Sequence, residues 1–217
     1  MRDLYHDQLD SVIADLVTMT HSVRDATRRA TEALLTANAE VAESVISDDV
    51  KIDDWRTSIE DRSFGLLARQ QPVAGDLRML VAALRMVADL ERMGDLAVHI
   101  AKVARLRYPD HALPSTAEPI IREMAEVAEI MVTSVSQIVA NQDVAAAADL
   151  EREDEVMDRL RRAGFRTLLS DSWEHGVEPA IDVALLGRYY ERIADHSVSM
   201  ARRVIYLVTG EHPAAVS

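Results

Sequence analysis

The sequence predicts an all-α protein, and three observations support this. Glycine and proline together supply only 13 of 217 residues, about half of their average share, whereas sheet proteins need both for their many turns. Aromatic residues make up 4% of the chain, while alanine, leucine, arginine and glutamate, which favour helices, are frequent. The third observation is that long segments with helical spacing of apolar residues lie between a few clear break signals.

The breaks fall where glycine, proline, asparagine or aspartate residues gather, at residues 71–76, 109–119, 141–143 and 175–179. Proline ends a helix because it lacks the amide hydrogen and clashes with the preceding turn. We therefore expect six helices, over residues 4–36, 39–69, 75–107, 116–139, 144–171 and 179–208.

An internal repeat organises these helices into two units. Residues 90–95 (LERMGD) recur as residues 190–195 (YERIAD), and residues 49–53 match residues 154–158. Repetition in the same order indicates a duplicated unit. The sequence thus predicts two tandem antiparallel three-helix bundles joined end to end: a first bundle at 1–108, a proline-containing linker at 109–115, a second bundle at 116–210 and a flexible tail at 211–217.

Composition excludes several classes of protein. The chain has no cysteine, so disulfides, thiolate metal sites and cysteine nucleophiles are absent. A formal charge of −13 repels phosphate backbones, which argues against nucleic-acid binding. No apolar run reaches the length of a membrane helix, and the first residues lack the apolar core of a signal peptide. We expect a cytoplasmic protein, and not an enzyme, because it has no glycine-rich phosphate loop, GxSxG or HExxH motif.

Each repeat carries two pairs of carboxylates spaced four residues apart, which places both members of a pair on one face of a helix. The pairs are Asp49 and Asp53, Glu91 and Asp95, Asp154 and Asp158, and Glu191 and Asp195. Glu91 and Asp95 continue an apolar stripe of Leu77, Val81, Leu84 and Ala88, whereas the solvent edge is marked by Arg78, Arg85, Asp89 and Arg92. We therefore expect the carboxylates to face the interior of each bundle.

Carboxylates that face inward need bound cations, basic partners or protonation. Pairs on facing helices suit hard or borderline cations, so we expect Mg, Mn, Fe or Zn ions, with His99 as a possible additional ligand. Gly94 and its equivalent Ala194 are small enough for a neighbouring helix to approach. The alternative is that structural ion pairs satisfy the carboxylates, using Arg56, Arg161 and Arg188, which lie near the same faces.

Taken together, the motifs resemble those of the PhoU family. The resemblance rests on residues 71–78, 89–95 and 188–196, followed by residues 204–207 and Gly210, and it covers nearly the whole chain. It implies six helices in two PhoU domains, whose E/DxxxD motifs bind metal clusters in some members. Carried onto this chain, those motifs are the eight carboxylates named above, although the first motif of each half has Asp at both ends, which shortens its reach.

The resemblance also implies a function. PhoU proteins restrain the phosphate-starvation response by coupling the ATPase of a phosphate ABC transporter to a phosphate-sensing histidine kinase. We therefore expect a negative regulator that acts through protein contacts, reaches the membrane only through its partners and forms a homodimer. The alternative is a carboxylate-bridged metal-binding or metal-storage protein, but neither Glu91 nor Glu191 is followed by the histidine at i+3 that such proteins use.

The spacing of three methionines and the positions of two histidines allow further predictions. Met79, Met86 and Met93 recur every seven residues, and we expect them to pack against other helices rather than to form a partner surface. His21 and His196 should be solvated or hydrogen-bonded.

Overall fold

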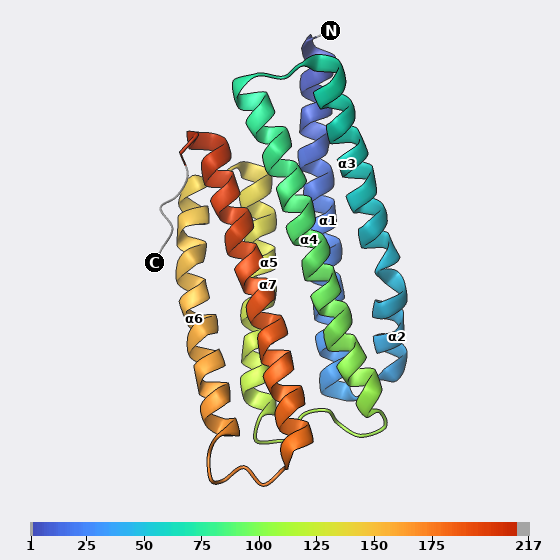
Figure 1. Cartoon of the computed structure of the whole chain (residues 1–217), viewed down its shortest axis with the longest axis vertical. Coiled ribbons are helices and arrows are strands. Elements are labelled where there is room, and N and C mark those ends of the chain that lie inside the picture. The colour runs from blue at the N-terminus through green and yellow to red at the C-terminus, as the bar shows by residue number, and fades with distance from the viewer. Residues whose placement is uncertain (1, 212–217) are drawn as a thin grey trace.

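The computed structural model describes residues 2–211, and within them all regular structure is helical (Figure 1). The fold class that the sequence predicts is confirmed, while the predicted tail lies almost entirely outside the described residues. The helices are α1 (Arg2–Thr36), α2 (Ala39–Asp48), α3 (Val50–Gln70), α4 (Ala74–Arg107), α5 (Glu118–Asn141), α6 (Val144–Leu168) and α7 (Val177–Thr209).

The second predicted helix is divided at Asp49 into α2 and α3. Asp49 keeps right-handed helical dihedral angles, with φ −58° and ψ −32°, so the two segments continue one another and six helical rods result. Side chains cap the helices that start after short turns: Asn38 accepts a hydrogen bond from the amide of Val41, and Asp143 accepts bonds from Ala145 and Ala146. Gly210 ends α7 in the left-handed conformation. None of these helices, over the range the structure covers, is long and apolar enough to span a membrane.

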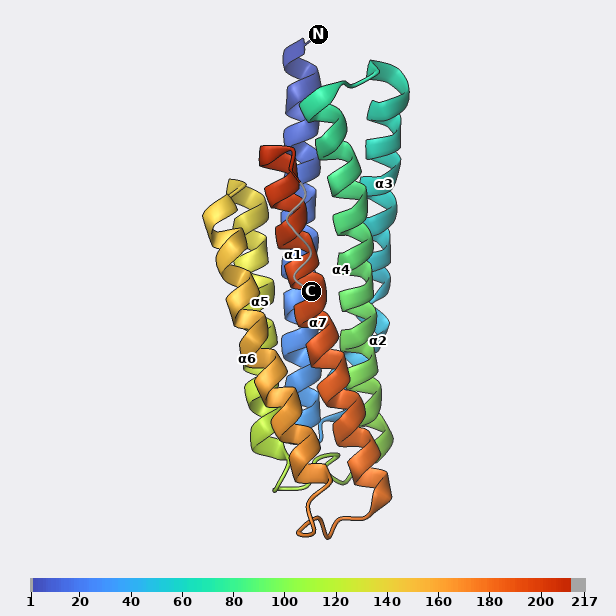
Figure 2. The same ribbon diagram turned by 60° about the vertical axis from the view of Figure 1, so that its left-hand side comes forward.

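The two predicted bundles are present, but they lie side by side and not end to end. The first contains α1, α2, α3 and α4, and the second contains α5, α6 and α7. Helix α1 packs on α5, and α4 packs on α7, along much of their length (Figures 1 and 2). The duplication predicts which helices form each bundle. The packing of one bundle on the other depends on a second apolar face of α1, α4, α5 and α7, and the repeat does not identify that face.

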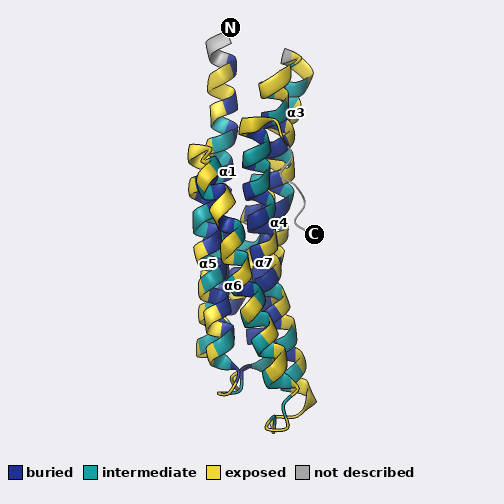
Figure 3. Cartoon of the chain, turned by 90° about the vertical axis from the view of Figure 1, so that its left-hand side faces the viewer, coloured by how far each residue is buried: buried dark blue, intermediate teal, exposed yellow. Residues whose placement is uncertain are grey.

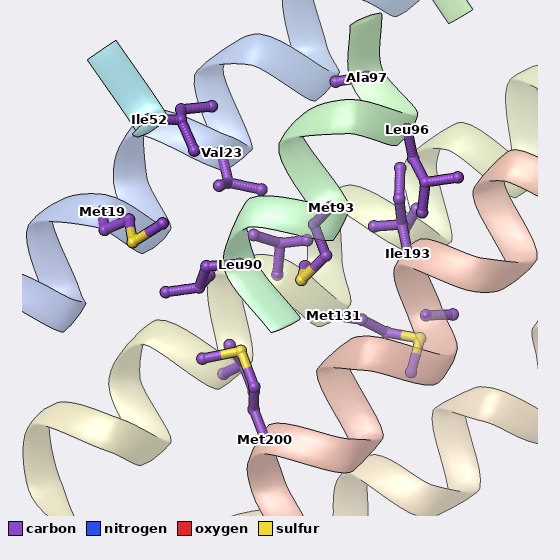
Figure 4. Close-up of a cluster of buried hydrophobic side chains, with 14 of the residues drawn as sticks. Met19, Val23, Ile52, Leu90, Met93, Leu96, Ala97, Met131, Ile193 and Met200 are labelled. Atoms are coloured by element: carbon purple, nitrogen blue, oxygen red, sulfur yellow. The ribbon is translucent and has the colours of Figure 1, made fainter. Parts of the chain in front are cut away.

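One continuous hydrophobic core fills both bundles and the seam between them. Dark, buried residues follow the inner faces of the helices in Figure 3, while the outer faces are exposed. Figure 4 shows the centre of this core, where Met93 of α4 and Ile193 of α7 meet side chains from α1 and α5. Met79, Met86 and Met93 are all buried, which confirms their predicted packing role.

The predicted orientation of α4 is only partly correct, since Arg85 and Arg92 are exposed as predicted but other residues are not where they were expected. Leu77 and Val81, expected to face the core, are 42% and 36% exposed, whereas Asp89, expected at the solvent edge, is only 4% exposed. The reason is that α4 packs against α1, α2 and α3 and also against α7, so it buries most of its circumference. Apolar residues are then spread around the helix, and periodicity alone does not identify the single exposed strip.

Candidate functional site: two carboxylate clusters

The structure brings the first four predicted carboxylates together where α3 meets α4. Asp49 lies at the start of α3, and its Oδ1 would be 3.4 Å from a Cβ placed on Gly94 of α4. Burial, followed by the negative charges of Asp95, Asp53 and Glu91, raises the pKa of Asp49. We call these four residues the first carboxylate cluster.

The second cluster repeats this arrangement between α6 and α7, with Asp154, Asp158, Glu191 and Asp195. Burial raises the pKa of Asp154 to about 6, and Asp195, Asp158 and Glu191 add to the effect in that order. The pKa of Asp195 is raised by burial and by the charge of Glu191. The clustering predicted from the repeat is therefore present in both halves.

Neither cluster lies in a bundle interior, so the expected inward orientation is wrong. Asp53, Asp95 and Asp195 are exposed, and Asp49, Glu91, Asp154 and Asp158 are partly buried. Glu191 is the one carboxylate of the eight that is buried, with 7% exposure. The clusters instead occupy the outer edge of each helix contact, beside the core, because the strip of α4 that carries Glu91 and Asp95 is its exposed one. Gly94 does allow the close approach expected of it: an added Cβ would meet Ile52 Cδ1 at 2.9 Å.

Arginines neutralise the glutamate of each cluster. Arg56 Nη1 lies 2.9 Å from Glu91 Oε1, and Arg161 Nη1 lies 3.3 Å from Glu191 Oε1. These two arginines stand at equivalent positions of the repeat, and Arg188 is a second ion-pair partner of Glu191. The ion pairs that the sequence predicted as an alternative to metal binding are therefore present. They involve Glu91 and Glu191 more than the aspartates.

The residue types in the clusters are suited to binding a cation, but the present arrangement of their side chains is not. Four carboxylates gathered at one helix contact are a typical donor set for hard cations, and the pKa values of Asp49 and Asp154 are raised by burial and by the charges of their neighbours. Within the part of the chain that the structure describes, however, no three His, Asp or Glu side chains are arranged to hold an ion. His99 lies beside Asp95, but its Nδ1 is 2.6 Å from the backbone oxygen of Asp95 and its ring packs on Tyr189. A bound cation would require the arginine pairs to rearrange.

Replacing Asp154 by asparagine should stabilise the protein above pH 6. Because folding raises the pKa of this carboxyl from 3.8 to about 6, the folded state holds the proton more tightly, and stability falls as the pH rises through that interval. The variant lacks this penalty. We expect a gain of about 1 kcal/mol at pH 7.5, reduced from the full electrostatic value because the group is partly exposed, and no gain below pH 4.

Urea denaturation across this pH range, with a chelator present, measures the effect. Glu155→Gln, on the exposed side of the same helix, is the matched control and should change stability little at any pH. An Asp154→Asn variant no more stable than the wild type at pH 7.5 would show that burial and the neighbouring carboxylates do not raise the pKa of Asp154 as described.

Sequence reasoning missed a buried polar network between the two halves. Asp89 Oδ1 lies 3.0 Å from His196 Nδ1, and Asp89 Oδ2 lies 3.0 Å from Nη2 of Arg203. His196 is therefore hydrogen-bonded, as expected, and so is His21, which pairs with Ser136 at 2.9 Å. A signal for the network was available, because Asp89, His196 and Arg203 replace the repeat-equivalent residues Tyr189, Leu96 and Val103.

Comparison with known proteins agrees with this architecture. The family model of the PhoU domain matches the chain twice, at residues 16–104 and 121–204. The phosphate-specific transport system accessory protein PhoU homolog 2 of Mycobacterium tuberculosis is 47% identical over 213 residues, which cover 98% of this chain and 100% of that protein. PhoU homolog 1 of Mycobacterium leprae is 45% identical over 98% of this chain and 96% of its own length.

A solved structure supports the same relationship. The crystal structure of PhoU from Pseudomonas aeruginosa is 28% identical and superposes with a TM-score of 0.87, covering 95% of this chain and 100% of that one. The twofold domain match, the full-length relatives and the shared helical fold lead to one conclusion: the chain belongs to the PhoU family.

Proposed function

We propose that this protein is a negative regulator of the phosphate-starvation response that acts in the cytoplasm through protein contacts. PhoU proteins are regulatory accessory proteins and not enzymes, and the relatives named above are accessory proteins of phosphate-specific transport. The proposal is that a homodimer of this chain couples the transporter ATPase to a phosphate-sensing histidine kinase. The observation that carries it is the match of both halves to the PhoU domain.

Deletion of the gene tests the regulatory role directly. In phosphate-rich medium, the deletion strain should express alkaline phosphatase and phosphate-uptake genes at the level normally seen during starvation. A copy of the gene restored elsewhere in the chromosome should return expression to normal. Unchanged expression in a strain that carries no second PhoU gene would contradict the proposal.

We further propose that the carboxylate clusters bind divalent or trivalent cations when the arginine pairs open. Burial, and then the negative charges of neighbouring carboxylates, raise the pKa values of Asp49 and Asp154, and a bound cation would offset both effects, which supports binding energetically. The aspartates would supply ligands first, because they take no part in the glutamate–arginine pairs: Asp49, Asp53, Asp95, Asp154, Asp158 and Asp195. Glu91 and Glu191 would join them once Arg56 and Arg161 move away.

Manganese titrated into chelator-treated protein should raise the melting temperature, since a ligand that binds only the folded state stabilises it. The double variant Asp154→Asn with Asp49→Asn should lose most of the rise, while the Glu155→Gln control should keep it. Elemental analysis of protein purified without chelator would identify the resident metal. Trace metal content together with an unchanged melting temperature would eliminate the metal role, and with it the metal-storage alternative.

A further inference from the structure

A basic groove runs along the seam between α4 and α7, next to both carboxylate clusters, and it shares Asp95 with the first of them. It has a volume of about 280 Å³. Arg92 and His99 line it from α4, and Arg188, Tyr189 and Arg192 line it from α7, with Leu96 between them. In a chain of net charge −13, three guanidinium groups in one groove are an unusual concentration of positive charge.

The described residues neutralise the positive charge of the groove only in part. Among the described residues, neither Arg92 nor Arg192 has an ion-pair partner. Arg188 pairs with Glu191, but that carboxylate is shared with Arg161, so the group of three keeps a net positive charge. Asp95 is the single acidic residue that lines the groove, against three arginines.

The repeat provides an internal comparison for this groove. Helices α4 and α7 are equivalent elements of the repeat and run antiparallel to each other. Each position of the repeat therefore occurs twice along the seam, once on each helix, and Tyr189 of α7 is equivalent to Asp89 of α4. On that other side of the seam, Asp89 contacts both His196 and Arg203 and supplies the neutralising carboxylate. The groove has a phenol at the same place, which leaves the arginines free and can itself donate a hydrogen bond to an anion.

We propose that this groove binds a condensed phosphate, meaning two or more linked phosphoryl groups, through Arg92, Arg188 and Arg192. The guanidinium fork matches phosphate oxygens and binds them in pairs. Arginines come from both helices, and the stretch of α4 from Arg92 to His99 is about 10 Å long at 1.5 Å per residue, which exceeds the reach of one phosphate. Pyrophosphate and the diphosphate of a nucleotide share this chemistry.

Calorimetric titration of the purified full-length chain tests the inference, with pyrophosphate, ADP, orthophosphate and sulfate at one ionic strength and with EDTA present. Pyrophosphate should bind saturably and at least tenfold more tightly than orthophosphate or sulfate. ADP binding as tightly as pyrophosphate would identify a nucleotide diphosphate as the source, and weaker ADP binding would identify the free condensed phosphate.

Variants locate the site. Arg92→Gln combined with Arg192→Gln should weaken pyrophosphate binding at least tenfold, whereas Arg162→Gln, an exposed arginine of α6 outside the groove, should leave it unchanged. Circular dichroism confirms that the variants fold. Equal weakening by the control, no saturable binding, or binding seen only in a parallel titration without EDTA would each overturn the inference, the last because it would place the anion on metal in the clusters. The result does not depend on the proposed regulatory role, since neither transporter nor kinase is present.

Discussion

Replacing Tyr190 by alanine should lower the free energy of unfolding by about 4 kcal/mol, the largest effect expected of any single substitution considered for this chain. Tyr190 of α7 is fully buried where the second bundle meets the first. Truncation removes the whole ring and leaves a cavity that rigid helices on either side close only in part.

The hydroxyl of Tyr190 adds a directed bond across the seam. Thr31 Oγ1 of α1 donates to the backbone oxygen of Thr27 at 2.9 Å, so its single proton is used. The 2.8 Å contact between Thr31 and Tyr190 must then have the tyrosine as donor. Burial raises the pKa of Tyr190, so the phenol stays protonated at neutral pH and remains able to donate this bond.

Urea denaturation of Tyr190→Ala, Tyr190→Phe and Tyr190→Leu separates these contributions. Phenylalanine removes only the hydroxyl and should cost about 1 kcal/mol. Leucine is the residue at the equivalent position of the first half, Leu90, and should cost an intermediate amount. A Tyr190→Ala variant destabilised by no more than the phenylalanine variant would mean that the ring does not fill the seam.

Break signals predicted the helical rods and the repeated carboxylate pairs predicted the clusters, because both depend on local spacing. Break signals such as residues 71–76 and 141–143 act within one turn of the chain, and pairs such as Glu191 and Asp195 lie on one helix face wherever that helix packs. The grouping of the pairs between helices followed from the duplication itself, because the same order of helices recurs in each half.

The orientation of α4 and the side-by-side joint could not be predicted in the same way. Both depend on which of several apolar faces meets another helix, and α4 has buried residues such as Leu80, Ala82 and Ala83 on more than one face. The environment of Asp89 was predicted wrongly for this reason. A carboxylate between Ala88 and Leu90 indicates a solvent edge on an amphipathic helix, whereas here its partners come from residues more than 100 positions away.

Replacing Asp89 by alanine should lower the free energy of unfolding by about 3 kcal/mol, because it removes the shared partner of two basic residues at the seam. The pKa of Arg203 is lowered by burial, and the charges of Arg85 and Arg92 lower it further, while Asp89 alone among the nearby groups raises it. Without Asp89, the partly buried guanidinium of Arg203 faces two other arginines. The value lies at the lower end for buried pairs because the Arg203 side chain retains 27% exposure.

A double-mutant cycle with Arg203→Val measures the coupling, since valine occupies the equivalent position, Val103, in the first half. If Asp89 serves mainly to neutralise Arg203, Asp89→Ala should cost much less in the Arg203→Val background than in the wild type. Arg202→Val, which removes an arginine one residue away that pairs with Glu151 at 2.7 Å, is the matched control and should leave the cost of Asp89→Ala unchanged. Additive effects of Asp89→Ala and Arg203→Val would contradict the coupling and leave His196 as the partner that matters.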